Sequence, residues 1–141
     1  MPDTEGAGRN RGASSLLVEF GPVGCSIEVG YVSDGSLNAA RGARGGGLGG
    51  PADHRKRKRD GSIEVLSNCA QVKLAEGETI LSVCCGGGGY GAPDERDPLR
   101  VINDFLEGRI SRIRAREIYK VVIDQDGRYD EAATSALRSR T

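Results

Sequence analysis

The sequence predicts a small, mainly β domain of the α+β class: a sheet or barrel-like body with glycine-rich, polyproline II-like segments and short C-terminal helices. Runs rich in β-branched residues lie between turn signals mid-chain, apolar residues take a helical spacing in the last third, and 22 of the 141 residues are glycine. We expect one domain: an extended glycine-rich arm at 1–14, a β and glycine-rich part at 15–92 and a helical end at 93–141.

Strands are expected first at residues 15–20 and 27–33. Both contain β-branched or aromatic residues, and the turn signals Gly21-Pro22 and Asp34-Gly35 bound them. The chain therefore begins its β part directly after the glycine-rich arm.

Two hairpins are predicted further on. The first joins the basic run 54–59 to the apolar run 62–66 through Asp60-Gly61, and Asp-Gly between extended runs is a strong hairpin signal. The second joins residues 70–74 to 79–84, because both runs alternate around a polar turn. The middle of the chain is thus expected to be mainly β.

The last third has helix signals. Asp97-Pro98 supplies an N-cap and a favourable first residue, and Gly108 marks the end of that helix. Ser111 and Asp130 are expected to cap two further short helices, with residues 121–123 returning to a strand between them. The apolar face of the first helix consists of Leu99, Ile102, Phe105 and Leu106.

The glycine runs at 41–51 and 86–89 require a conformation other than helix, since each interior glycine costs about 1 kcal/mol relative to alanine. They suit extended polyproline II-like segments, which have no internal hydrogen bonds. Without Cβ atoms, neighbouring segments can approach closely and satisfy their N–H and C=O groups between chains. We expect these segments to dock into a larger subunit.

Residues 86–91 also fit the Gly-x-Gly-x-x-Gly fingerprint of dinucleotide binding, with Asp124 in the place of a ribose-binding acid. In that motif the helix opens within the loop, whereas here it begins only at Pro98. Close backbone packing is therefore the favoured interpretation of the run.

Composition narrows the class of protein. Twenty basic and 20 acidic residues balance, so no global field favours nucleic acid or a membrane. Apolar runs are too short for a membrane span, and the acidic start does not resemble a signal peptide. We expect a cytoplasmic protein whose four cysteines stay reduced.

A zinc site is one interpretation of the thiols and the single histidine. Cys25, His54, Cys69 and either Cys84 or Cys85 have the side chains that zinc prefers, although no Cys-x-x-Cys spacing is present. The ordinary interpretation is buried free thiols on strands.

A nucleic-acid-binding module is an alternative of a different class. Residues 41–60 combine Arg-Gly steps with a Lys/Arg cluster, as in RGG-type RNA-binding segments. Against it, no Phe or Tyr interleaves the Arg-Gly run to stack on bases, and the Lys/Arg run is expected to be one solvated arm of a hairpin.

Several separated motifs occur in a set order along the chain. They are Gly6-Ala7-Gly8-Arg9 with Arg11-Gly12, Ser33-Asp34-Gly35, the run 41–51, Gly86 to Gly91, Glu95-Arg96-Asp97-Pro98, and the closing runs 121–124 and 130–134. Together they resemble the C-terminal part of the hydantoinase B/oxoprolinase family, with one departure at Ala13, which replaces the second glycine of the first motif. The resemblance extends over nearly the whole chain, as though that terminal part existed as its own polypeptide.

The resemblance implies a small structural or assembly subunit of an ATP-dependent carboxylase complex acting on a ketone such as acetophenone, with a subunit of an ATP-dependent hydantoinase or oxoprolinase as the alternative. Large kinase-like and hydantoinase B-like partners would hold ATP and Mg²⁺ and carry the chemistry, in which the enol of the ketone and bicarbonate are phosphorylated and then combined.

This chain itself has no Walker-type loop and no Ser-His-Asp or Cys-His pair at a recognisable spacing, so we expect no catalytic or cofactor-binding residue in it and no activity alone. Contacts with the partner subunits are expected from Arg9, Arg11, Arg41, Arg44, Gly86, Gly87, Gly88, Gly89 and Tyr90.

Overall fold

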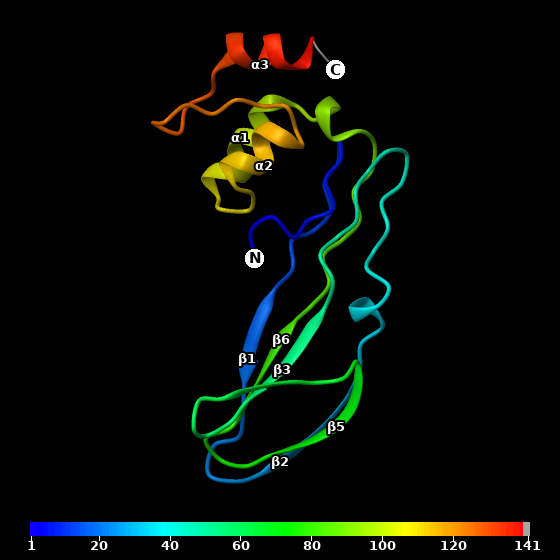
Figure 1. Ribbon diagram of the computed structural model, residues 1–141, viewed down its shortest axis with the longest axis vertical. Coiled ribbons are helices and arrows are strands. Elements are labelled where there is room, and N and C mark those ends of the chain that lie inside the picture. Colours follow the sequence, from blue (N-terminus) through cyan, green and yellow to red (C-terminus); the bar gives the residue numbers. More distant parts are fainter. Residues whose placement is uncertain (140–141) are drawn as a thin grey trace.

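The computed structural model describes residues 1–139. Strands gather at one end of the molecule and helices at the other, with long extended segments running between them (Figure 1). The mainly β, α+β fold predicted from the sequence is confirmed. The strands are β1 (Leu17–Phe20), β2 (Ile27–Val32), β3 (Asp53–Arg57), β4 (Ile63–Val65), β5 (Cys69–Leu74) and β6 (Thr79–Val83); the helices are α1 (Pro98–Leu106), α2 (Arg112–Glu117) and α3 (Glu131–Arg138), with 3-10 turns η1 (Asp34–Ser36) and η2 (Pro93–Glu95).

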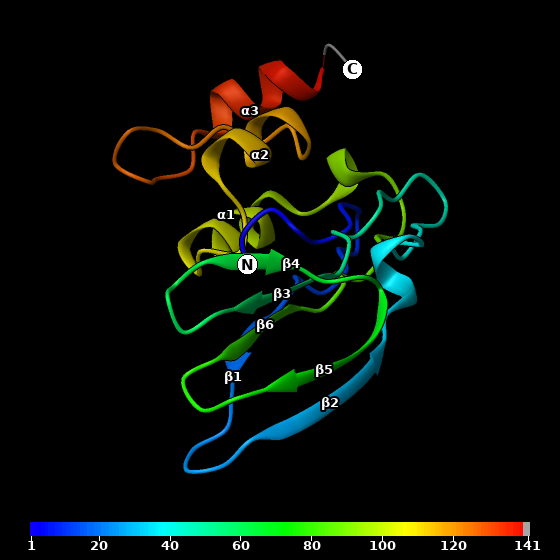
Figure 2. The same cartoon turned by 60° about the horizontal axis from the view of Figure 1, so that its bottom comes forward.

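The strands form two antiparallel sheets rather than a closed barrel. One sheet has the order β1-β6-β3-β4 and the other pairs β2 with β5 (Figure 2). The centroid of the Tyr31 ring in β2 lies 4.9 Å from the centroid of the His54 ring in β3. The smaller sheet therefore covers one face of the larger sheet. No element of residues 1–139 covers the opposite face of the larger sheet.

One predicted hairpin is correct and the other is wrong. β3 and β4 pair across Asp60-Gly61 as expected. A turn also joins β5 to β6, but β5 pairs with β2 while β6 lies between β1 and β3. The alternation of apolar and polar residues predicts that a strand forms, but it does not predict which strands pair with it. Pairing depends on how the two faces of the strand are buried, and β6 is apolar enough to lie in the centre of a sheet. The two strands therefore turn a corner between sheets.

The helix caps are those the sequence predicts. Asp97 Oδ1 accepts a hydrogen bond from Leu99 N at 2.9 Å, Ser111 Oγ from Arg114 N at 3.1 Å and Asp130 Oδ1 from Ala133 N at 2.9 Å. The strand expected at 121–123 is wrong, because only a single bridge joins Ile123 to Tyr129. No neighbouring strand lies there in the described chain, and the residues pack against helices instead.

Three extended segments, residues 4–14, 40–50 and 86–91, lie side by side and form what we call the glycine bundle. Their backbones exchange hydrogen bonds, for example Gly47 N to Ala7 O at 2.7 Å and Gly89 N to Gly47 O at 3.0 Å. A Cβ atom on Gly89 would overlap the Ala7 carbonyl, and one on Gly46 would overlap the Gly89 carbonyl. The close packing of bare backbone predicted from the sequence occurs, but the prediction that these backbone groups pair between chains is wrong, because they pair within this chain.

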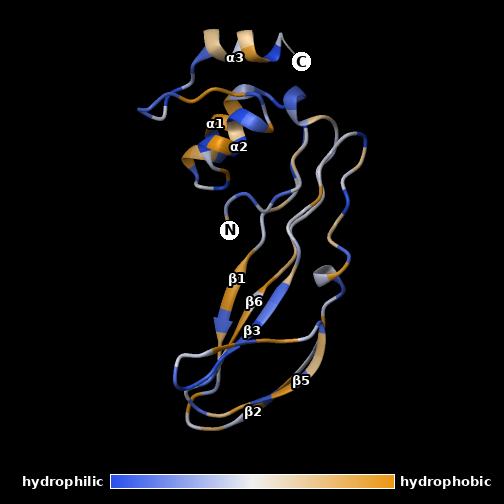
Figure 3. Ribbon diagram, in the orientation of Figure 1, coloured by the Kyte–Doolittle hydropathy of each residue, from blue (hydrophilic) through white to orange (hydrophobic). Residues whose placement is uncertain are grey.

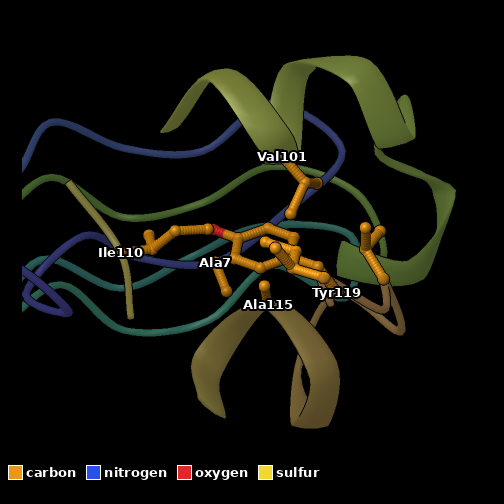
Figure 4. Packing of buried hydrophobic residues seen from close by; sticks show 7 residues of the cluster. Ala7, Val101, Ile110, Ala115 and Tyr119 are labelled. Carbon is orange, nitrogen blue, oxygen red and sulfur yellow. The ribbon is translucent and has the colours of Figure 1, made fainter. Parts of the chain in front are cut away.

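The apolar core lies at the helical end and includes one residue of the glycine bundle. Val101 of α1 and Ala115 of α2 point toward each other with the fully buried Tyr119 ring between them (Figure 4). Ala7 closes this cluster from the bundle side, so the core joins the helices to the bundle. Its remaining buried members are Ile110, Val121 and Ile123.

The close packing of the glycine bundle predicts that the addition of a single methyl group there destabilises the fold. We expect Gly89→Ala to lower the free energy of unfolding by about 3 kcal/mol, because the new Cβ overlaps backbone that has no freedom to move aside. The matched control is Gly30→Ala in β2, where an added Cβ meets nothing within 4 Å, and here we expect a change below about 1 kcal/mol. Urea unfolding followed by circular dichroism measures both; equal effects would contradict the packing account.

Candidate functional site

The clearest polar cluster joins the glycine bundle to the helices, and we call it the junction. Asp104 of α1 is 3% exposed. Its Oδ1 accepts from Arg11 Nε at 2.8 Å, and its Oδ2 accepts from Arg96 Nη2 at 2.9 Å. A buried carboxylate is costly unless it is paired and hydrogen-bonded, and two guanidinium groups meet that need here. The bundle and α1 are thereby fastened together.

A second buried carboxylate completes the junction. Glu5 is fully buried, and its Oε1 accepts from Arg114 Nε at 2.6 Å and from the Tyr119 hydroxyl at 2.9 Å. Arg114 Nη2 also donates to the Glu5 carbonyl at 2.8 Å. Burial, together with the nearby Glu5 charge, raises the pKa of Tyr119 well above its usual value. The N-terminal arm is thus held by charge-assisted hydrogen bonds to α2 and its C-terminal end.

Sequence reasoning missed Asp104, Glu5 and Tyr119. The predicted apolar face of α1 is wrong in part, because Val101 and Asp104 are its buried residues whereas Leu99 and Leu106 are exposed. Asp104 lies on the side of the helix opposite the predicted face, so it carried no signal. Glu5 carried none either, since it precedes the first motif in a polar stretch. In chemical terms the junction is a set of ion pairs that holds elements together, and within the described chain Glu5 Oε2 is its one carboxylate oxygen that is buried without a hydrogen-bond partner.

The nearest approach to a catalytic pair lies between the sheets. Ser82 Oγ is 3.1 Å from His54 Nδ1, beside a cavity of about 60 Å³ that the Tyr31 ring also lines. Activation of a serine by histidine requires a carboxylate or similar group on the other ring nitrogen. His54 Nε2 is buried and has no hydrogen-bond partner within residues 1–139. The pair therefore lacks the third member that a nucleophilic site needs.

The structure does not bring the four zinc candidates together. In the described part of the chain, no three His, Cys, Asp or Glu side chains are placed to share a metal ion. Cys25, Cys69, Cys84 and Cys85 are free but exposed, so their expected burial is wrong. Cys84 Sγ accepts a hydrogen bond from Leu16 N at 3.1 Å, and His54 faces Ser82. The zinc site stays an untested prediction.

The expected partner-contact residues fall into two groups. The first is engaged inside the chain: Arg11 lies in the junction, and the N–H groups of Gly86, Gly87 and Gly89 donate to carbonyls within the bundle, as does that of Gly91. Those N–H groups are unavailable for a phosphate.

The second group lies at the exposed tip of the bundle. The Arg44 guanidinium stands 5.7 Å from the centre of the Tyr90 ring, and Arg9 pairs with Glu95 at 3.8 Å. Arg41 is also exposed, whereas the backbone of Gly88 is pressed against that of Arg41. Partner contact through this tip stays a prediction.

The basic run forms β3 and the turn that follows it, as the hairpin interpretation predicts. Each of its Lys and Arg residues finds a partner within the chain, so the nucleic-acid alternative gains no support. The pairs are Arg55 with Asp53, Lys56 with Glu78, Arg57 with Glu19, Lys58 with Glu64, and Arg59 with the Glu76 carbonyl.

No helix within residues 1–139 is long and apolar enough to cross a membrane.

The fold and the interlaced glycines define a module that also occurs inside longer chains. A solved ATP-dependent caprolactamase from Pseudomonas jessenii contains it, with a TM-score of 0.73 and 30% identity over 99% of this chain and 25% of that one. An acetone carboxylase structure matches with a TM-score of 0.70 at 20% identity, over 99% of this chain and 23% of that one, which shows the shared fold. The chain belongs to the hydantoinase B/oxoprolinase family, whose sequence model matches residues 1–93.

Curated relatives agree with this assignment. The chain is 36% identical to the caprolactamase beta subunit of Pseudomonas jessenii over 99% of its own length, and 31% identical to a putative D-/L-hydantoinase subunit of a Pseudomonas species over 84%. It is also 38% identical over 60% of its length to the acetophenone carboxylase delta subunit of Aromatoleum aromaticum, of which it covers 13%. The chain spans about a quarter of the first two relatives, 25% and 22%.

The junction predicts that Asp104→Asn is strongly destabilising. The substitution removes the charge that two buried guanidinium groups share, so we expect a loss of about 3 kcal/mol in the free energy of unfolding. Glu107→Gln is the matched control, because Glu107 pairs with Arg109 at the exposed surface, and we expect little change. Chemical denaturation of both variants measures the difference; similar losses would contradict the assigned roles.

The raised pKa of Tyr119 predicts that the free energy of unfolding depends on pH. The raised pKa of Tyr119 means that the fold favours the protonated phenol, so the protonated phenol stabilises the folded state. This stabilisation is complete below the usual tyrosine pKa of 10.0 and is lost as the pH rises above that value toward the folded-state pKa. We expect Tyr119→Phe to cost about 2 kcal/mol at pH 8, and the gap from the unmodified chain to narrow above pH 10.

Urea unfolding at intervals from pH 8 to 11 measures this gap. Tyr31, whose pKa is also raised by burial, contributes to both proteins and cancels in the comparison. A gap that stays constant across this range would contradict the account.

Proposed function

We propose that this chain is a structural and assembly part of the hydantoinase B-type component of an ATP-dependent multi-subunit enzyme. The observation that carries the proposal is its 36% identity, over 99% of its length, to the caprolactamase beta subunit. The preserved fold in the solved ATP-dependent caprolactamase supports the same conclusion. Partner chains would bind ATP and Mg²⁺ and perform the chemistry.

The geometry supports a structural role. The two buried carboxylates, Asp104 and Glu5, are each committed to guanidinium groups of the same chain. The Ser82–His54 contact has no third member among residues 1–139. Side chains that hold an enzyme together are paired in this way, whereas catalytic acids and bases are left poised with perturbed pKa values beside a cleft.

Hydrolysis of a cyclic amide, such as a lactam or a hydantoin, is the reaction class we favour for the complex. The two relatives that match this chain over most of its length are the caprolactamase and hydantoinase subunits. Carboxylation of a ketone, the expectation from the sequence, is the second candidate, and the match to the acetophenone carboxylase delta subunit supports it over a shorter stretch. A cytoplasmic location is part of the same proposal.

Co-purification tests the proposal. The natural polypeptide that carries this sequence is tagged in its source cells. We expect it to bring down further chains of an ATP-dependent enzyme. Purification of a solitary chain without ATPase partners would contradict the proposal.

Substrate-stimulated ATP hydrolysis by the purified assembly then separates the two reactions. Stimulation by caprolactam or hydantoin identifies amide hydrolysis. Stimulation by acetophenone or acetone with bicarbonate identifies the carboxylase, and overturns our preference between the two.

A further inference from the structure

The open face of the four-stranded sheet carries apolar side chains that nothing in the described chain covers. Register places Leu17 opposite Val83 and Leu81 opposite Arg55, which in turn lies opposite Val65, so these residues share one face. Leu17 is 49% exposed and Val65 71%. The apolar character of β1 and β6 is visible in Figure 3. The same face also carries the ion pairs of Arg55 with Asp53 and of Arg57 with Glu19, so its apolar residues form a patch within a polar surround. An exposed apolar patch rimmed by polar residues indicates a contact surface.

This face continues into a groove along one side of the molecule. A hollow of about 240 Å³ on the sheet is lined by Leu17, Leu81, Val83 and Met1. Met1 also lines a second hollow of about 430 Å³, which extends to Arg11 and Arg109. Those two arginines line a third hollow of about 490 Å³ beside α1. We call these three adjoining hollows the side groove.

The groove changes chemistry along its length. Its sheet end is apolar, whereas its α1 end contains Arg100, an exposed residue whose side chain has no hydrogen bond or ion pair within residues 1–139. Arg109 shares this end and is paired with the exposed Glu107. Asp104 offsets only one of Arg11 and Arg96, so this end carries an excess of positive charge, and Arg100 is its exposed, unpaired part. A matching occupant therefore presents a carboxylate there.

The middle of the groove contains buried hydroxyl groups without partners. Ser14 and Ser15 line the second hollow, Ser15 is 2% exposed, and neither Oγ has a hydrogen-bond partner in the described chain. These oxygens are buried beneath the surface of the hollow, so they are not available to an occupant. The groove is thus apolar at its sheet end and basic at its α1 end.

We propose that the side groove binds a segment of hydantoinase B-type polypeptide that lies outside residues 1–141, with apolar side chains over β1 and β6 and an acidic residue facing Arg100. The proposal rests on the proposed function. It commits to this occupant because the same fold occurs in chains about four times as long, so that three quarters of a family chain is available to cover the face. A surface with an apolar part and a charged end is typical of a specific contact between proteins.

Site-specific crosslinking tests the location of the contact. The photoreactive residue p-benzoylphenylalanine replaces Val65 or Arg100 in the natural polypeptide and its assembly. Val65 lies beside the first hollow, opposite its lining residue Arg55, and Arg100 lines the third. The control positions are Leu37, which is 75% exposed beside η1, and Arg116, an exposed residue of α2; neither lines the groove. We expect positions 65 and 100 to crosslink to hydantoinase B-type peptides outside residues 1–141, and the controls not to.

Charge substitutions measure the strength of the same contact. We expect Val65→Glu and Arg100→Glu each to reduce recovery of the partner polypeptide, or docking of the segment, by roughly tenfold or more, whereas Leu37→Glu and Arg116→Glu leave it unchanged. All four substituted side chains are exposed, and circular dichroism checks that each variant folds.

The outcomes separate the two proposals. Crosslinks from positions 65 and 100 to a second copy of this chain, to an unrelated protein or to nothing would overturn the groove inference, as would equal crosslinking from the controls. If the ATP-dependent assembly still co-purifies in that case, the proposed function stands and only the location of the contact is wrong. If no assembly forms at all, the proposed function fails first.

Discussion

Contact between bare backbones in the glycine bundle is the constraint on which the rest of the structure depends. Three segments from distant parts of the sequence lie so close that a Cβ atom on Gly46, Gly86 or Gly89 would overlap a carbonyl group of a neighbouring segment. The same closeness lets their N–H and C=O groups pair without forming a sheet. Both lobes of the molecule are attached to these segments, so the bundle sets their relative position (Figure 1).

The buried ion pairs extend this constraint to the helices. Arg11 leaves the bundle to reach Asp104 across 93 residues of sequence, and Glu5 reaches Arg114 across 109. A buried charge is costly unless it is paired with an opposite charge. Each ion pair therefore specifies where α1 and α2 lie, in addition to any stability that it contributes. The motifs that resemble the family and the residues that build the bundle are largely the same, which gives the family likeness a physical cause.

Helix caps and tight turns could be predicted from the sequence, whereas strand pairing and ion pairs between residues far apart in the sequence could not. Asp97, Ser111 and Asp130 cap their helices, and Asp60-Gly61 turns its hairpin, because each acts on backbone within a few residues. The place of β6 between β1 and β3 depends on how two faces are buried, and the pair of Asp104 with Arg11 depends on a partner far away in sequence. Missing Cβ atoms predicted close packing, but which backbones would meet depended on the whole fold.

The bundle also explains why a contact surface can span both lobes. Arg11 and Arg109 lie where the sheet end and the helical end of the side groove meet, and Arg11 is fixed by its bond to Asp104. A groove crossing a flexible connection would lose its shape between the lobes, and any partner would have to restore that order at a cost in conformational entropy. Here interlocked glycine backbone holds Leu17 of the sheet and Arg100 of α1 at a set separation before anything binds. A domain without a poised acid, base or nucleophile in its described residues can thus still act in an enzyme, by presenting a preorganised surface to the chains that carry the chemistry.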